Sequence, residues 1–216
     1  MLFRSLDSIT HTVVVKPNPV VDPVAAQNYC QGALVPPLHF TGSMPGIQFS
    51  WTNSNPAIGL PASGTGDLPP FVATNTGAAV SQATITVTPV AQGCPGAPVS
   101  FTITVNPIPQ LVQVPDQTWC AGSVVPLTAL SATVSGASFS WTNTNTAIGL
   151  AGAGTGDIPS FTATNTGNAA ISAVVSIIPS ANGCSGPAGA YTIVVKQVPT
   201  LRSEEHTSNS SHEWIS

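Results

Sequence analysis

The chain repeats itself at an offset of ninety residues. The segment 49–77, FSWTNSNPAIGLPASGTGDLPPFVATNTG, returns at 139–167 with 21 of its 29 residues identical. The same offset relates the four cysteines in pairs, without an insertion or a deletion. A period this long predicts tandem copies of one folded module rather than a solenoid of short units. The question of function therefore becomes what one copy does.

Both ends of the chain fall outside this repeat. Residues 202–216, RSEEHTSNSSHEWIS, resemble the conceptual translation of a sequencing adapter, and residues 1–5 resemble the matching adapter end. We exclude both from the reasoning on the fold, and we expect the remainder to be a fragment of a longer array. We expect five parts. Residues 1–16 are an adapter-like start with the last strand of a preceding truncated module, and residues 17–106 and 107–196 are two complete modules. Residues 197–201 are the start of a truncated next module, and residues 202–216 are the adapter-like tail.

Charged residues are scarce between the adapter-like ends. Two lysines and five aspartates give this part a net charge of −3, and no lysine or arginine lies between Lys16 and Lys196. A surface without a basic patch cannot neutralise phosphates or hold an anionic membrane surface. We therefore exclude nucleic acid as a partner and expect no membrane insertion in this fragment.

Apolar and polar residues alternate wherever the sequence is regular. The run 101–105, FTITV, alternates apolar residues with threonine, and the second copy keeps its apolar positions. This pattern predicts half-buried antiparallel strands, and no window has helical apolar spacing. About seven strands per module predict an all-β chain of two-sheet sandwiches with almost no helix. The expected strands of the first copy are 20–24, 34–40, 48–53, 71–75, 83–89 and 99–106, with a short edge strand near 58–60.

Aromatic side chains recur in pairs two residues apart, on one face of a strand. They are Phe49 and Trp51 in the first copy and Phe139 and Trp141 in the second. Rings on the apolar face of a central strand form a core, whereas a sugar-stacking platform would need them exposed. We favour the core. Tyr29 and Trp119, which directly precede a cysteine, either cap the core edge or lie open, and the sequence does not decide between the two.

The order of motifs resembles the PKD-like modules repeated in very large surface and gliding-motility-associated proteins of certain bacteria. It runs from a cysteine through W-T-N-x-N-x-A-I-G-L, G-T-G-D-[LI]-P-x-F-x-A-T-N and a V-x-P-x-A-x-G-C-x-G turn to a closing T-I-T-V-N-P strand. The resemblance covers residues 17–106 and 107–196. It implies an immunoglobulin-like β-sandwich, secretion, a spacer or adhesive role and no catalytic residue. The W-D-F-G-D-G run of PKD domains from secreted hydrolases is absent, which weakens any transfer from those proteins.

Catalytic groups do not recur between the copies. His39 is the one histidine inside a complete module, and Ala129 stands at its equivalent position. Only one carboxylate per module recurs, and acid–base pairs need two. The cysteines lack the C-x2-C spacing of a zinc site. We therefore expect no enzyme and no cofactor.

The recurring carboxylates, Asp67 and Asp157, are weak calcium candidates. The asparagines Asn53, Asn55 and Asn75 could add oxygen ligands, but calcium usually takes more than one carboxylate. The alternative, which we favour, is that the aspartate closes a turn through its own backbone or caps a short turn.

Four cysteines allow three sets of pairs: 30–94 with 120–184, 30–120 with 94–184, and 30–184 with 94–120. If every copy folds alone, each must use its own cysteines. We therefore predict the disulfides Cys30–Cys94 and Cys120–Cys184, which require an oxidising compartment. The competing expectation is four buried free thiols.

Three prolines lie in each joint between modules, at 16–23 and 106–115. They favour an extended, semi-rigid connection. We therefore expect a non-catalytic, extracellular spacer or adhesive segment of a large secreted or cell-surface bacterial protein. Its expected partners are neighbouring modules of the same chain, with surface glycans or proteins as further candidates. The alternative function is a carbohydrate-binding accessory module of a secreted hydrolase.

Overall fold

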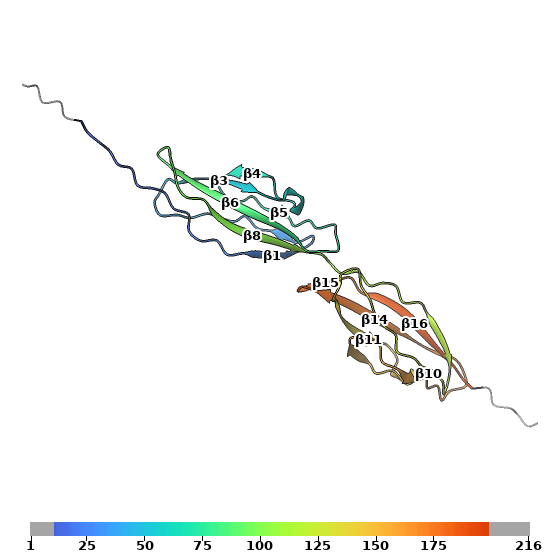
Figure 1. The fold of residues 1–216 in the computed structure, drawn as a ribbon. Helices are drawn as coiled ribbons and strands as arrows, with labels where there is room; N and C mark the ends of the chain where they lie inside the picture. Colours follow the sequence, from blue (N-terminus) through green and yellow to red (C-terminus); the bar gives the residue numbers. More distant parts are fainter. Residues whose placement is uncertain (1–10, 199–216) are drawn as a thin grey trace, which may run out of the picture. The chain divides into compact units, whose positions relative to one another are not determined.

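The computed structural model describes residues 11–198, so the adapter-like segments 1–5 and 202–216 lie outside the described residues. The chain forms two compact units, which divide between Gln110 and Leu111. Figure 1 shows that both units are built from strands. A loop of the second repeat, 132–137, and a hairpin of it, 180–186, belong to the first unit. The module boundary at 106 and 107 stays a prediction.

The first repeat consists of eight strands and one short 3-10 turn. They are β1 (Gln27–Cys30), β2 (Leu34–Val35), β3 (Gln48–Asn53), η1 (Pro56–Ile58), β4 (Ser63–Thr65), β5 (Phe71–Val72), β6 (Ser81–Ala91), β7 (Cys94–Pro95) and β8 (Val99–Asn106).

The second repeat has the same elements, each displaced by ninety residues. They are β9 (Gln117–Cys120), β10 (Val124–Val125), β11 (Ser138–Asn143), η2 (Thr146–Ile148), β12 (Ala153–Thr155), β13 (Phe161–Thr162), β14 (Ile171–Ala181), β15 (Cys184–Ser185) and β16 (Gly189–Lys196).

Each repeat contains one large sheet and one two-stranded sheet. In the first repeat the large sheet has the order β1-β8-β6-β3-β4, with β7 also paired to β6, and the small sheet is β2-β5. Strand β1 runs parallel to β8, which places Cys30 opposite Asn106, and the other pairs are antiparallel. The second repeat has the same order, β12-β11-β14-β16-β9 with β10-β13. This architecture is an immunoglobulin-like β-sandwich.

Strand β6 shows why the sequence forms this sandwich. Its residues Ala83, Ile85 and Val87 are all fully buried, while Thr84 between them is exposed. A strand points successive side chains to opposite faces, so this alternation buries one face of the sheet. Burying a side chain of the size of Ile85 or Val87 contributes about 1.5–3 kcal/mol.

The recurring aromatic pairs lie in or against these cores. Trp51 and Trp141 are 3% and 4% exposed, and the half-buried Phe49 and Phe139 pack against the buried clusters. Tyr29 and Trp119, whose placement the sequence left open, are half-buried at the core edges. Their polar atoms donate hydrogen bonds to Gln27 and Gln117, at 3.1 Å in each case. The buried tryptophan rings cannot serve as an exposed sugar-stacking platform.

The predicted all-β, immunoglobulin-like class is confirmed, but several strand boundaries differ. The expected strand at 20–24 is reduced to one bridge between Val21 and Gly42, because flanking prolines lack the N–H that a ladder needs. Strand β1 was not predicted, since Gln-Asn-Tyr-Cys shows no alternation. The edge strand lies at β4, and the segment near 58–60 ends the η1 turn instead. Within residues 11–198, no helix is long and apolar enough to cross a membrane.

Candidate functional site

The recurring asparagines hold loops to strands through their side-chain amides. Asn53 is 7% exposed, and its Nδ2 donates to the carbonyls of Leu60 at 2.9 Å and Pro61 at 3.2 Å. Its Oδ1 accepts from the N–H of Asn55 at 2.9 Å. Asn143 makes the equivalent bonds in the second repeat. The recurrence of this residue is therefore explained by the fold.

A second asparagine ties the loop before β6 to the last strand. Asn75 Nδ2 donates to the carbonyls of Ala79 at 2.9 Å and Val105 at 2.8 Å, and its Oδ1 accepts from the N–H of Gly77 at 3.0 Å. Asn165 repeats all three bonds. Because the side-chain oxygens of Asn53 and Asn75 already accept backbone N–H groups, they are poorly placed to act as calcium ligands.

Two glycines of the repeated block are explained by close approaches. Gly59 caps the η1 turn at φ +97°, and a Cβ there would collide with the Val72 carbonyl. Gly64 lies against the ring of Trp51, which a Cβ would strike. Only glycine adopts the first conformation at no cost and allows the second contact.

Replacing Asn53 with alanine should destabilise the first repeat by about 1–3 kcal/mol, because it leaves buried carbonyl and N–H groups without partners. Urea unfolding followed by circular dichroism measures the loss. The exposed neighbour Thr52→Ala is the matched control and should stay within about 0.5 kcal/mol of the parent. Equal losses in both variants would contradict the role given to the amide.

The calcium candidate Asp67 contacts a neighbouring loop rather than closing its own turn. Its Oδ1 accepts from the N–H of Phe40 at 2.9 Å, and its Oδ2 lies 2.6 Å from His39 Nδ1. Asp157 keeps only the backbone bond, to Leu130 N–H at 2.8 Å, because Ala129 replaces the histidine. Among residues 11–198, no three His, Cys, Asp or Glu side chains gather as a metal site would require. Asp67 and Asp157 therefore stay weak calcium candidates, and a role without calcium stays the favoured expectation.

The hydrogen bond from Phe40, together with His39, lowers the pKa of Asp67 below its ordinary value of 3.8. A carboxyl with a depressed folded-state pKa stabilises the fold above its unfolded value and loses that contribution as pH falls through the folded value. The first repeat should therefore lose stability below about pH 4. The loss should stay below about 1 kcal/mol, because the side chains of His39 and Asp67 are 74% and 42% exposed.

Thermal unfolding between pH 6 and pH 2 measures this effect. Asp67→Asn should flatten the acid dependence of the first repeat. His39→Ala, which reproduces the residue of the second repeat, should retain the part of the acid dependence that comes from the hydrogen bond between Asp67 and the Phe40 N–H. An unchanged acid profile in Asp67→Asn would refute the assignment.

An open groove crosses the large sheet of the first unit at β3, β4 and β6. Its polar lining consists of hydroxyl side chains, from Ser50, Thr52, Ser63, Thr65, Thr86 and Thr88, and it contains no charged residue. Trp51 and Gly64 complete it. This surface can offer hydrogen bonds to a neutral polar partner, but it holds no acid–base pair.

The cysteines contradict the prediction from the sequence. Cys30 is bonded to Cys184, with the two Cα atoms 5.7 Å apart, and Cys94 and Cys120 are free thiols. The predicted pairs Cys30–Cys94 and Cys120–Cys184 are therefore wrong. The bridge corresponds to one of the alternatives, 30–184, but without its companion 94–120.

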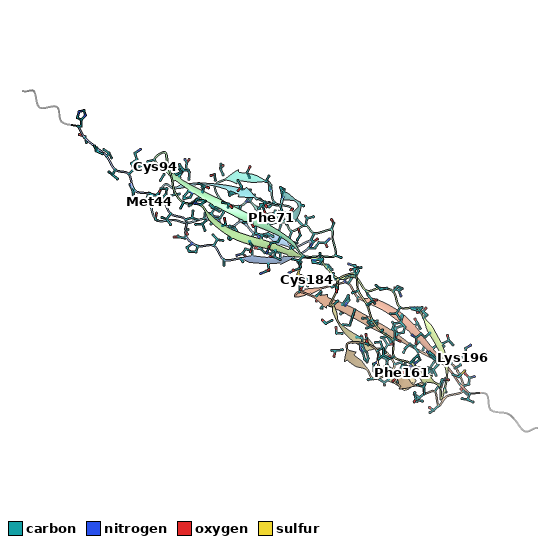
Figure 2. The ribbon with its side chains drawn as sticks, viewed as in Figure 1. Met44, Phe71, Cys94, Phe161, Cys184 and Lys196 are labelled. Atoms are coloured by element: carbon teal, nitrogen blue, oxygen red, sulfur yellow. A yellow bond between two sulfur atoms is a disulfide. The ribbon has the colours of Figure 1, made fainter. Side chains whose placement is uncertain are left out.

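Strand β8 gives the physical reason for the correction. Cys30 lies opposite Asn106, where β8 ends, whereas Cys94 pairs with Ala91 in the hairpin that precedes the start of β8. Eight residues of strand span roughly 25 Å, and a disulfide needs Cα atoms within about 7 Å. The two cysteines of one repeat therefore lie at opposite ends of the sheet. Figure 2 shows Cys94 at the end of the first unit where Met44 lies.

The hairpin of the second repeat supplies the partner that Cys30 bonds. Residues 180–186, which include Cys184 in β15, belong to the first compact unit. Asn106 Nδ2 donates to the carbonyl of Asn182 in this hairpin at 3.4 Å. The disulfide thus forms inside the first unit while connecting residues of two different repeats. Sequence reasoning treated each repeat as closed and missed this connection.

Comparisons with known proteins agree with this architecture. Residues 27–109 match the family model described as PKD-like domain. The chain is therefore a tandem of immunoglobulin-like β-sandwich repeats, and the first repeat is similar to PKD-like domains over all eight of its strands. No curated protein sequence matches the chain.

Several solved structures are similar at low identity. IG1+IG2 of DIP-gamma is 11% identical with a TM-score of 0.45, covering 85% of this chain and 99% of that one. EC22-24 of mouse cadherin-23 is 11% identical with a TM-score of 0.43, covering 84% and 67%. EC1-2 of human mucin-like protocadherin is 9% identical with a TM-score of 0.44, covering 84% and 98%.

Proposed function

We propose that the chain is a non-catalytic, extracellular repeat segment that acts as a semi-rigid spacer or adhesive part of a large secreted or cell-surface bacterial protein. The observation that carries this proposal is the disulfide between Cys30 and Cys184, which fastens one repeat to the next. Disulfides persist in oxidising compartments, so the bond supports secretion. The similarity of residues 27–109 to PKD-like domains supports the type of module.

The joint supports a stiff connection rather than a flexible tether. Prolines 107, 109 and 115 fix the backbone dihedral φ and remove hydrogen-bond donors in the segment that follows β8. The disulfide adds a second covalent link beside this polypeptide link. A second covalent connection between neighbouring repeats suits a spacer whose task is to add length.

The surface composition supports an extracellular spacer as well. Outward positions of the sheets are rich in threonine and serine, such as Thr84 and Ser100, and no lysine or arginine lies between Lys16 and Lys196. A neutral hydroxyl surface gives trypsin-like proteases almost no site to cut. The His39–Asp67 pair of the first repeat does not recur, because Ala129 stands at the position of the histidine in the second repeat.

Small-angle X-ray scattering on proteins with two, three and four repeats tests the proposal. The maximum dimension should grow in proportion to the number of repeats. A protein that collapses into a compact globule, with its dimension growing as the cube root of the number of repeats, would overturn the spacer. A matched series that carries Cys30→Ser and its equivalents should show a broader distribution of dimensions if the disulfide contributes to stiffness.

A further inference from the structure

The disulfide joins two cysteines that occupy different positions in the repeat. Cys30 has the same place in the first repeat that Cys120 has in the second, and Cys184 has the same place in the second that Cys94 has in the first. The bond therefore runs from the β1-type strand of one repeat to the β7-type hairpin of the following repeat. The two free cysteines are the remaining halves of this pattern.

The contacts around the bridge define what a complete junction contains. Cys30 lies opposite Asn106 in the parallel pair of β1 with β8, and the N–H of Gln31 donates to the Asn106 carbonyl at 2.9 Å. The side chain of Asn106 then reaches the carbonyl of Asn182, two residues before Cys184. Asn106, at the end of β8, thus contacts the segments that carry both cysteines of the disulfide.

The segment before the first repeat makes half of the same junction. Lys16 is equivalent to Asn106 at the ninety-residue offset, and Gln92 is equivalent to Asn182. Lys16 Nζ donates to the carbonyl of Gln92 at 2.8 Å, two residues before the free Cys94. The Lys16–Gln92 contact beside Cys94 is therefore equivalent to the Asn106–Asn182 contact beside Cys184. Compared with the junction at Cys184, the junction at Cys94 lacks only the cysteine of a β1-type strand beside Lys16.

The end of the second repeat makes the opposite half. Cys120 lies opposite Lys196 in the parallel pair of β9 with β16, and the N–H of Ala121 donates to the Lys196 carbonyl at 2.8 Å. This arrangement matches Cys30 beside Asn106. The missing component is the hairpin of a following repeat.

The exposure of the thiols fits this division. Cys184 is 2% exposed, whereas its counterpart Cys94 is only half-buried. Cys30 is half-buried, and its counterpart Cys120 is exposed. Each free cysteine is thus more open than the bonded cysteine at the same position of the other repeat.

We propose that Cys94 and Cys120 are inter-repeat disulfide sites, and that their partners are further copies of this ninety-residue repeat. Cys94 bonds the β1-type cysteine of a preceding copy, and Cys120 bonds the β7-type cysteine of a following copy. Each pair of adjacent repeats in the array is then joined by one disulfide, and no disulfide forms within a single repeat. The inference rests on the array of the proposed function.

The bond forms by thiol–disulfide exchange with a disulfide oxidant such as oxidised glutathione or an oxidised dithiol enzyme. The thiolate of one cysteine attacks the oxidant and forms a mixed disulfide, which releases one oxidant thiol. The second cysteine thiolate displaces the other oxidant thiol. Two protein thiols are oxidised to one disulfide, and one oxidant disulfide is reduced to two thiols.

Counting thiols in chains of different length tests the proposal. In a three-repeat protein made by adding a second copy of residues 107–196 after Lys196, we expect two disulfides and two free thiols, the same number of free thiols as in the present chain. Titration with a chromogenic disulfide under denaturing conditions gives the number. Peptic peptide mapping by mass spectrometry should find Cys120 bonded to the added counterpart of Cys184.

Two other counts would overturn the inference. No free thiol would mean that each repeat bonds its own cysteines, and four free thiols would mean that only the Cys30–Cys184 joint forms a disulfide. Cys120→Ser is the matched control: in the three-repeat protein it should remove the second bridge and leave Cys30–Cys184 in place.

A second protein tests the other half-site independently. A copy of residues 17–106 placed before Pro17 should bond its counterpart of Cys30 to Cys94, with two free thiols again, and a reduced Cys94 there would refute its assignment. The thiol count and the scattering measurement test different claims. An array that has the predicted disulfides but is compact would overturn only the proposed spacer function. An extended array with four free thiols would overturn only the proposal that Cys94 and Cys120 form inter-repeat disulfides.

Discussion

Trp51→Ala should destabilise the first repeat by about 3–5 kcal/mol, the range for removing a large aromatic side chain from a core. Trp51 is 3% exposed, lies opposite Val87 in the pairing of β3 with β6, and packs its ring over Gly64. Neither the sheet nor the close-packed glycine can fill the resulting cavity. Because a small domain has a net stability of about 5–15 kcal/mol, this single change removes a large part of it.

Hydrogen–deuterium exchange measured by mass spectrometry shows where the stability is lost. In Trp51→Ala, amides of β3, β6 and β8 should exchange faster, while those of β11, β14 and β16 keep their protection. Trp141→Ala is the matched variant and should give the reverse pattern. Uniform acceleration in both repeats would show that the two cores are not independent.

Cys30→Ser should lower the stability of the oxidised chain by about 2–4 kcal/mol, the typical contribution of a disulfide. The bond closes a separation of 154 residues. A loop of this length corresponds to about 5 kcal/mol in the chain-entropy description, and disulfides commonly deliver less than that description gives. The contribution is largest for the state in which both units are unfolded, because only then is the whole loop free.

Cys120→Ser provides the control at the equivalent position. Cys120 is an exposed free thiol, so its replacement should change the stability by no more than about 0.5 kcal/mol. Guanidinium chloride unfolding of both variants, with and without a reductant, separates the two effects. Adding the reductant should lower the stability of the parent and of Cys120→Ser, and should leave Cys30→Ser unchanged. Equal stability of all oxidised proteins would contradict the contribution assigned to the bridge.

The sandwich could be predicted from the sequence because its signal is local. The alternation of apolar and polar residues in β6 and β8 directly gives the buried face of each strand. Trp51, in β3, falls on the same face of the sheet. Strands β3 and β8 were predicted with their observed boundaries, since apolar residues alternate along both. Strand β1 could not be predicted in this way, because its pairing with β8 depends on backbone hydrogen bonds to residues 76 positions away, from Gln27 opposite Ile103 to Cys30 opposite Asn106.

The disulfide could not be predicted because repeat symmetry alone is ambiguous. Bonding within each repeat and bonding between neighbours both treat every copy alike, so the ninety-residue offset favours neither. The choice depends on distance along the sheet, which places Cys30 at one end of β8 and Cys94 at the other. The bond between Asp67 and His39 was missed for a related reason: it exists in only one copy, and a search for recurring pairs passes over it.

The bridge also changes how the chain carries a pulling force. A force applied at the two ends passes from Cys30 to Cys184 through the sulfur atoms, so the backbone between them is not stretched. Fully extended, those residues would add on the order of 500 Å of contour length. The oxidised chain therefore cannot extend by this length even if its β-sandwiches unfold. Reduction of the Cys30–Cys184 disulfide would make the extension possible. The redox state of the surroundings, rather than the strength of any single sheet, then sets how far the segment can lengthen under load.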